Sequence, residues 1–172
     1  MAGNYLEQLV AEWYEYQGYF VRRNVPVGRR PKGGYDCELD VVAFHPERKH
    51  LVHLEPSTDA LSWKKREVRY RKKFDSGRKH IPDLFSGLPV PDHIEQIAVF
   101  IFASSKNVKE IGGGRVLLIR ELLGDIFAHL RSRKFASHAV TENFPILRTM
   151  QLVATYKNSV LKALEAGSDH QS

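Results

Sequence analysis

Two apolar stretches of the sequence each carry a carboxylate, and this arrangement constrains the fold more than any other feature. Residues 38–43 read E-L-D-V-V-A and residues 51–55 read L-V-H-L-E. Short aliphatic runs of this kind, bounded by turn residues, predict two strands joined by a turn. A carboxylate in an apolar strand costs free energy unless something compensates it. A divalent metal held between Asp40 and Glu55 would do so, because hard cations take carboxylate oxygens as ligands.

Alternation along these strands predicts which side chains accompany the two acids. Residues two apart on a strand share a face. Asp40 should therefore face away from Leu39 and Val41, and His53 should share the face of Glu55. A metal site of histidine and carboxylate is one interpretation of that pair. A surface histidine beside a loop is the commoner case.

The remaining elements predict an α/β fold built as a single domain over residues 1–164. A chain of 172 residues most often forms one domain with a sizeable core. Periodicity and turn residues predict a helix, three strands, a helix, two strands and two helices. These elements are expected at residues 4–17, 19–27, 38–43, 51–55, 58–74, 94–104, 115–120, 121–135 and 145–164. This order predicts a mixed sheet with helices on both faces, and the polar segment 165–172 is expected to be disordered.

Proline and glycine suggest where two of these elements stop. Pro56 lacks an N–H, so we expect its end of the strand to lie on an edge or to be unpaired on one side. Segment 75–91 contains three prolines and two glycines and predicts a long loop. Segment 94–104 is strongly apolar and predicts a strand in the middle of the sheet.

Basic residues concentrate in two segments and favour a polyanionic partner. The formal net charge is +6 and the isoelectric point is about 9.5. Residues 28–34 form a basic turn, and residues 64–73 read K-K-R-E-V-R-Y-R-K-K. A solvated basic helix is one interpretation of the second segment, and a surface for a nucleic-acid backbone is the other. The residues expected to contact phosphates are Arg29, Arg30, Lys32, Arg69, Lys72 and Lys73.

Cysteine content and apolar runs bear on the compartment. Cys37 is the only cysteine, so neither a disulfide within the chain nor a cysteine-based zinc site can form. No apolar run approaches the ~18 residues that a membrane span needs, and no signal peptide is evident. These features predict a cytoplasmic protein without a membrane partner.

The first helix offers a third acid. Its apolar face places Glu7 at the boundary of the core, next to Tyr14. Glu7 lies three residues after Asn4, so it could equally help to cap the helix. Gly18 is expected to end the helix.

These residues resemble the pattern of the PD-(D/E)XK nuclease superfamily, and most closely that of archaeal Holliday-junction resolvases. The pattern is a helix with a glutamate that ends at Gly-aromatic, a D-[ILV]-[ILV]-A strand and an E-x-K strand. Here it corresponds to Glu7, Gly18-Tyr19, Asp40-Val-Val-Ala and Glu55-Pro-Ser, within residues 4–75. The resemblance implies the restriction-endonuclease-like α/β fold, a mixed β-sheet flanked by helices.

The resemblance also implies a chemistry. Asp40, Glu55 and Glu7 would hold Mg²⁺, with Mn²⁺ as a substitute, and the protein would hydrolyse DNA phosphodiester bonds. Nucleases of this fold often act as homodimers.

One position departs from the pattern, because Ser57 stands where the family has a lysine. The lysine could have moved to the following helix, where Lys64 and Lys65 are the nearest candidates for the catalytic role. Alternatively, the chain is an inactive DNA-binding module or a subunit of a larger repair or defence assembly. A site that cleaves phosphodiesters needs a positive charge to balance its carboxylates, and serine cannot supply one.

Overall fold

The computed structural model describes residues 4–102 and 108–166. The chain separates into two compact units, with the boundary after Glu121. The single domain expected over residues 1–164 stays a prediction. Most of the tail expected to be disordered, residues 167–172, lies outside the described residues.

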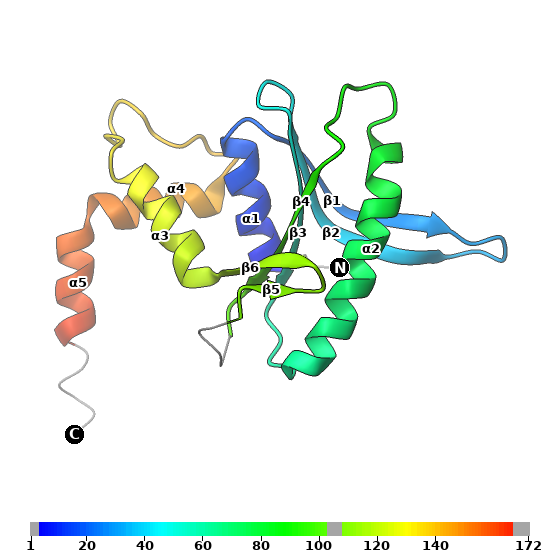
Figure 1. The fold of residues 1–172 in the computed structure, drawn as a ribbon. Coiled ribbons are helices and arrows are strands. Elements are labelled where there is room, and N and C mark those ends of the chain that lie inside the picture. Colours follow the sequence, from blue (N-terminus) through cyan, green and yellow to red (C-terminus); the bar gives the residue numbers. More distant parts are fainter. Residues whose placement is uncertain (1–3, 103–107, 167–172) are drawn as a thin grey trace. The chain divides into compact units, whose positions relative to one another are not determined.

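A six-stranded mixed sheet forms the centre of the first unit (Figure 1). Its strands are β1 (Phe20–Arg29), β2 (Tyr35–His45), β3 (His50–Ser57), β4 (Ile94–Phe100), β5 (Glu110–Ile111) and β6 (Gly114–Leu118). Their order is β1-β2-β3-β4-β6-β5. The first three strands pair antiparallel, β3, β4 and β6 pair parallel, and β5 returns antiparallel to β6. The sheet and its helices confirm the α/β class and are consistent with the restriction-endonuclease-like arrangement. The position of β4 inside the sheet confirms the expected central strand.

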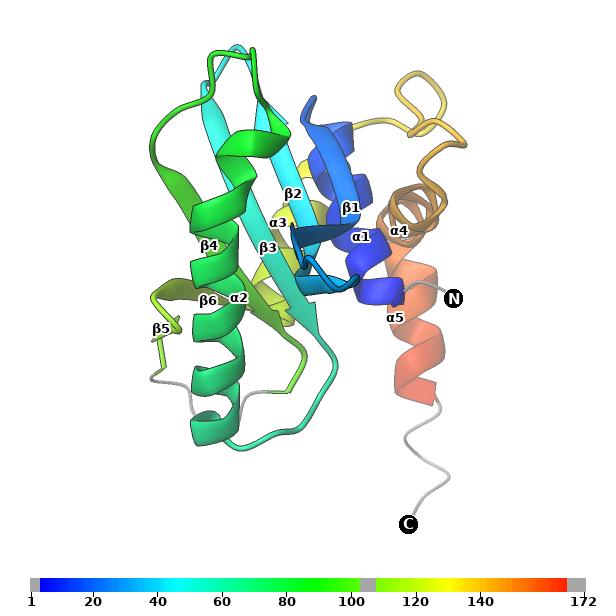
Figure 2. The same cartoon turned by 90° about the vertical axis from the view of Figure 1, so that its right-hand side faces the viewer.

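Two helices cover opposite faces of this sheet (Figure 2). Helix α1 (Tyr5–Tyr16) begins at Asn4, whose Oδ1 accepts a hydrogen bond from the Leu6 N–H at 3.1 Å. Gly18 follows the helix with φ +89°, a conformation that glycine adopts without strain. Helix α2 (Trp63–Leu84) lies on the other face. No helix among the described residues is long and apolar enough to cross a membrane.

The second unit is helical. Helix α3 (Ile119–Leu130) starts just before the boundary, and α4 (Pro145–Thr155) and α5 (Lys157–Ala166) follow. The single helix expected at residues 145–164 is therefore two helices, interrupted at Tyr156. Residues 165 and 166, expected to be disordered, belong to α5.

Helix α2 is longer than expected, because it continues ten residues into the segment interpreted as a loop. Gly77 and Pro82 cost about 1 and about 3 kcal/mol in a helix interior. Ile81 and Phe85 are almost completely buried, and each contributes about 1.5–3 kcal/mol by leaving water. Packing of this last part of α2 against the sheet therefore outweighs the local preference for a turn.

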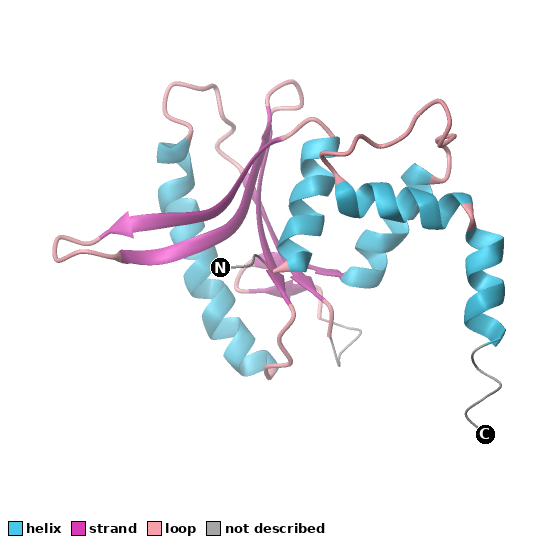
Figure 3. Ribbon diagram, turned by 180° about the vertical axis from the view of Figure 1, so that it is seen from behind, coloured by secondary structure: helices cyan, strands magenta, loops and turns pink. Residues whose placement is uncertain are grey.

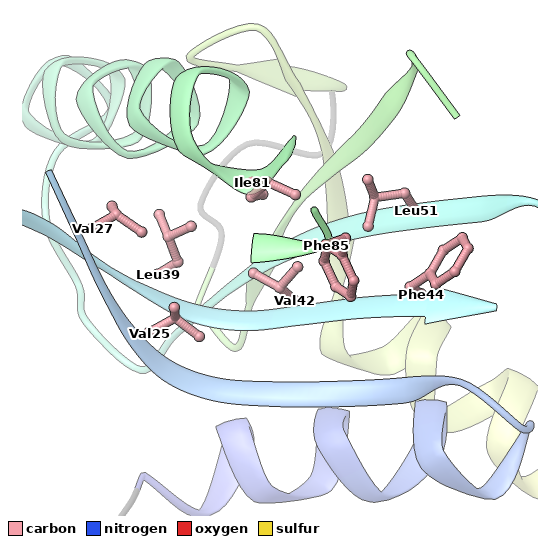
Figure 4. Packing of buried hydrophobic residues seen from close by; sticks show 8 residues of the cluster. All are labelled: Val25, Val27, Leu39, Val42, Phe44, Leu51, Ile81 and Phe85. Carbon is pink, nitrogen blue, oxygen red and sulfur yellow. The ribbon is translucent and has the colours of Figure 1, made fainter. Parts of the chain in front are cut away.

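The buried cluster beneath α2 also breaks the expected alternation (Figure 4). Leu39 and Val42 belong to this one cluster, although strict alternation would place them on opposite faces. The break coincides with Asn24, which has φ +50° and lies opposite Asp40 in the register of β1 and β2. The pairing of these strands skips this position, which leaves room for an irregular backbone beside Asp40.

The hairpin of β1 and β2 extends away from the rest of the first unit (Figure 3). Arg29 ends β1, and the turn at the tip of the hairpin carries Arg30 and Lys32; all three are exposed. The predicted basic loop is therefore a protruding arm.

Gly77 gives α2 its close approach to the sheet. A Cβ at this position would overlap Nδ1 of His53 and lie 3.2 Å from Nε2 of Gln96. Gly77→Ala should therefore lower the free energy of unfolding by about 1–3 kcal/mol, despite alanine's better helix propensity. Gly124→Ala is the matched control, because a Cβ there meets nothing within 4 Å. It should raise stability by up to about 1 kcal/mol. Urea denaturation of both variants measures the difference, and equal effects would contradict this packing.

Candidate functional site

The strands β2 and β3 separate where the two acids lie. Their backbone pairing ends at Val41 and Leu54. One residue further, the Asp40 N–H donates to Oε1 of the Glu55 side chain at 3.2 Å instead of to a backbone carbonyl. Beyond this point Pro56 pairs with β4 alone. The prediction that Pro56 is unpaired on one side is confirmed, although β3 is an interior strand and not an edge.

A lysine from α2 lies between the two carboxylates. Nζ of Lys73 is 2.5 Å from Oδ1 of Asp40 and 2.5 Å from Oε2 of Glu55. The side chains of Lys73, Asp40 and Glu55 are 16%, 12% and 2% exposed, so water screens these charges only weakly. Three charged groups from β2, β3 and α2 thus form one buried cluster, which we call the Lys73 cluster.

Burial and mutual repulsion control the protonation of this cluster. Burial and the neighbouring Glu55 carboxylate raise the pKa of Asp40 to about 7, against the effect of Lys73. Burial also raises the pKa of Glu55. Burial opposes the charge on Lys73, but the two carboxylates outweigh it and raise the pKa of the ammonium. Lys73 therefore stays charged at neutral pH while Asp40 titrates there.

Glu7 lies close to the cluster without joining it. Partial burial raises the pKa of Glu7, and the Asp40 charge raises it further, whereas Lys73 and Arg23 lower it. Within residues 4–102 and 108–166, the side chain of Glu7 makes no hydrogen bond or ion pair. Its role as a direct metal ligand stays a prediction.

The other lysines proposed for catalysis lie elsewhere. Lys64 and Lys65 are exposed in the first turn of α2 and form no ion pair among the described residues. The structure brings Lys73 to the carboxylates in their place, although the sequence pattern had suggested phosphate contacts for Lys73. The buried stripe of α2 could have indicated this. Tyr70 and Gly77 belong to the stripe, and Lys73 stands between them at helical spacing.

Ser57, the residue that replaces the motif lysine, holds the connection between β3 and α2. Its hydroxyl donates to Oδ2 of Asp59 at 2.5 Å and accepts from the Asp59 N–H at 3.1 Å. Asp59 in turn pairs with Arg66 at 3.2 Å and with Arg69 at 2.8 Å. Nη1 of Arg69, a residue expected to contact phosphates, is therefore already paired with Asp59. Lys72, which was expected to do the same, is exposed.

His53 is buried, contrary to the expectation of a surface histidine. Its side chain is 0% exposed and its Nε2 lies 2.8 Å from Oε1 of Glu55. Nδ1 lies 3.3 Å from Nε2 of Gln96. Both ring nitrogens therefore have partners, which leaves no lone pair for a metal.

The cluster fits a cation held by two carboxylates. The ammonium of Lys73 is itself a cation between Asp40 Oδ1 and Glu55 Oε2. Mg²⁺ often takes only one or two carboxylates from a protein and completes its shell with water and substrate phosphate. In the part of the chain that the structure describes, no three His, Cys, Asp or Glu side chains group closely enough to hold a metal. A metal at this cluster would therefore have Asp40 and Glu55 as its two protein ligands.

Comparison with known proteins does not assign a family. No family model matches the chain, and no curated protein matches it. The functional conclusion therefore depends on the geometry of the Lys73 cluster.

The raised pKa of Asp40 predicts how stability depends on pH. In the folded state this carboxyl keeps its proton up to about pH 7, whereas its ordinary pKa is 3.8. The folded state therefore binds more protons between these values, and stability falls as pH rises through this window. Asp40→Asn removes the titrating group. It should be more stable than the wild type at pH 8 by about 1–4 kcal/mol and equal to it near pH 4.

Urea denaturation at pH 4, 6 and 8 measures this effect. Asp36→Asn is the control, because Asp36 is exposed and its pKa is lowered by a hydrogen bond from Arg30. Relative to the wild type, the Asp36→Asn variant should show no gain in stability between pH 4 and pH 8. A wild-type protein whose stability rises relative to Asp40→Asn between pH 4 and pH 8 would contradict the assigned protonation.

Proposed function

We propose that the protein is a metal-dependent endonuclease that hydrolyses DNA phosphodiester bonds at the Lys73 cluster. The observation that carries the proposal is the ammonium of Lys73, 2.5 Å from each of two buried carboxylates. The PD-(D/E)XK pattern requires two acids and a lysine, and Ser57 leaves the lysine unaccounted for. Lys73 supplies this charge from α2.

Each member of the cluster has a chemical role in this proposal. Mg²⁺ or Mn²⁺ bound by Asp40 and Glu55 would lower the pKa of a water molecule and offset charge on the phosphate. Lys73 would stabilise the negative charge that develops on the phosphate oxygens. The low exposure of all three side chains makes this interaction stronger than it would be in water.

Basic residues around the first unit suit a polyanionic substrate. Arg29 and Lys32 are exposed on the arm formed by β1 and β2, and Lys72 is exposed on α2. Arg30 is exposed as well, although it pairs with Asp36 at 2.7 Å. Contacts of this kind bind the DNA backbone and carry no sequence information. Cytoplasmic location and a homodimer stay predictions.

A second function is favoured by one observation. Lys73 already compensates both carboxylates, and no third metal-binding side chain lies with them within the described residues. The same fold could therefore bind DNA without cutting it, either alone or in a larger assembly. A DNA-binding module would use the same basic surface as the endonuclease. It differs from the endonuclease only in that its Lys73 cluster would bind no metal and cleave no DNA.

Replacing Lys73 tests its role in cleavage. Lys73→Met should reduce Mg²⁺-dependent cleavage of plasmid DNA by about 100-fold or more, because a charge-stabilising group is lost. Lys65→Met is the control. It removes one exposed lysine of the same helix and should change cleavage by no more than about 2-fold, since surface charges away from the site have small effects. Circular dichroism tests whether both variants are folded. Equal cleavage rates of the two variants would rule out Lys73 as the motif lysine.

The basic arm can be tested through the salt dependence of binding. Alanine at Arg29 and Lys32 should weaken DNA binding for all sequences alike. It should also reduce the slope of log K against log salt by about 0.9 for each phosphate that the variant no longer neutralises. Fluorescence anisotropy at several salt concentrations measures the slope. An unchanged slope would show that the arm does not bind phosphates.

A further inference from the structure

A chain of hydrogen-bonded polar side chains runs from Arg78, which is exposed, through the buried Gln96 and His53 to the Lys73 cluster. Arg78 donates through Nη1 to Oε1 of Gln96. Nε2 of Gln96 lies 2.8 Å from the carbonyl oxygen of Phe74 and 3.3 Å from Nδ1 of His53. Nε2 of His53 lies 2.8 Å from Oε1 of Glu55. Gln96 and His53 occupy paired positions on β4 and β3, and α2 covers them.

The two ends of this chain determine the direction of every hydrogen bond in it. The guanidinium of Arg78 can only donate, and the carbonyl of Phe74 can only accept. The amide of Gln96 is therefore oriented with its oxygen toward Arg78 and its nitrogen toward Phe74 and His53. Nδ1 of His53 must then accept, so the proton of the neutral ring is on Nε2. His53 consequently donates to Glu55.

This hydrogen bond fixes which oxygen of Glu55 faces the cluster. Oε1 accepts from His53 Nε2 at 2.8 Å and from the Asp40 N–H at 3.2 Å, so two donors of the sheet hold it. Oε2 is left for Lys73 at 2.5 Å. Without His53 one of the two fixed donors is lost, and the carboxylate can rotate about its last torsion.

Close packing surrounds the ring of His53. The side chain is 0% exposed and Phe74 packs against its ring edge-on, with centroids 5.4 Å apart. Gly77 lies directly against Nδ1, at the point where a Cβ would overlap the ring. Glycine is a poorer helix former than alanine, so the helix loses stability to make room for this imidazole.

We propose that His53 is a positioning residue of the candidate nuclease site, and that the Nε2–H tautomer set by Gln96 orients Glu55 for the reaction. This inference rests on the proposed function, since Glu55 is the group that His53 positions. His53 itself touches neither metal nor substrate. Removing a donor that orients a metal-binding group in this way changes activity by about 10–100-fold.

Two variants of His53 distinguish positioning from packing. His53→Phe keeps a ring of similar shape and removes the donor. His53→Gln loses the ring but keeps a donor, because its amide nitrogen lies as many bonds from the backbone as Nε2 of histidine. Positioning predicts that His53→Phe lowers kcat by about 10-fold or more with little change in KM, and that His53→Gln restores most of the loss. A purely structural role predicts that Phe serves at least as well as Gln, and this order would overturn the inference.

A second readout is independent of cleavage. Two-bond ¹H–¹⁵N NMR correlations of the wild-type protein at pH 7 report which ring nitrogen carries the proton, and the His53→Gln spectrum assigns the signal. The inference predicts a neutral ring with the proton on Nε2. A proton on Nδ1, or on both nitrogens, would overturn it. If the wild type shows this tautomer but cuts no DNA, the proposed function fails, and with it the catalytic purpose of the positioning, while the hydrogen bond to Glu55 stands.

Discussion

The buried ion cluster in which Lys73 compensates both Asp40 and Glu55 is the interaction that explains the irregular backbone of the first unit. Removing Lys73 would leave two buried carboxylates uncompensated, which costs about 3–5 kcal/mol for a buried ion pair. Replacing a whole buried pair by apolar residues is often neutral or stabilising. A buried lysine with two carboxylates therefore adds little to the free energy of unfolding. The pKa of Asp40, raised to about 7, shows that the charged form of this carboxyl is disfavoured in the folded protein. Strongly perturbed carboxyls of this kind gather at functional sites.

Several features of the backbone serve to assemble this cluster. Beyond Val41 and Leu54 the strands β2 and β3 are no longer paired, which frees the Asp40 N–H for the Glu55 side chain. Helix α2 must continue past Phe74 for Ile81 to anchor its far end on the sheet. The lost pairing between β2 and β3 and the glycine and proline within α2 each cost stability. Such costs are expected where the backbone orients the side chains of a functional site, and not in a core.

Part of this site could be predicted from the sequence, and the limit has a physical cause. Asp40 and Glu55 stood out because carboxylates rarely interrupt apolar strands, and adjacent strands bring them together. Lys73 did not stand out, because it is one of many basic residues on α2 and only the packing of the helix selects it. His53 was misjudged for a similar reason, since its burial depends on Gln96 and Gly77 in distant elements. The extra length of α2 likewise follows from tertiary packing that outweighs Gly77 and Pro82.

In the proposed function, the Lys73 cluster hydrolyses phosphodiester bonds with a bound divalent metal. The most direct measurement is the conversion of supercoiled plasmid to nicked and linear DNA by the wild-type protein, with Mg²⁺, with Mn²⁺ and with EDTA. Hydrolysis at this cluster predicts cleavage with either metal and none with EDTA. Tight, salt-sensitive DNA binding without cleavage under any of these conditions would contradict it and would favour the DNA-binding module.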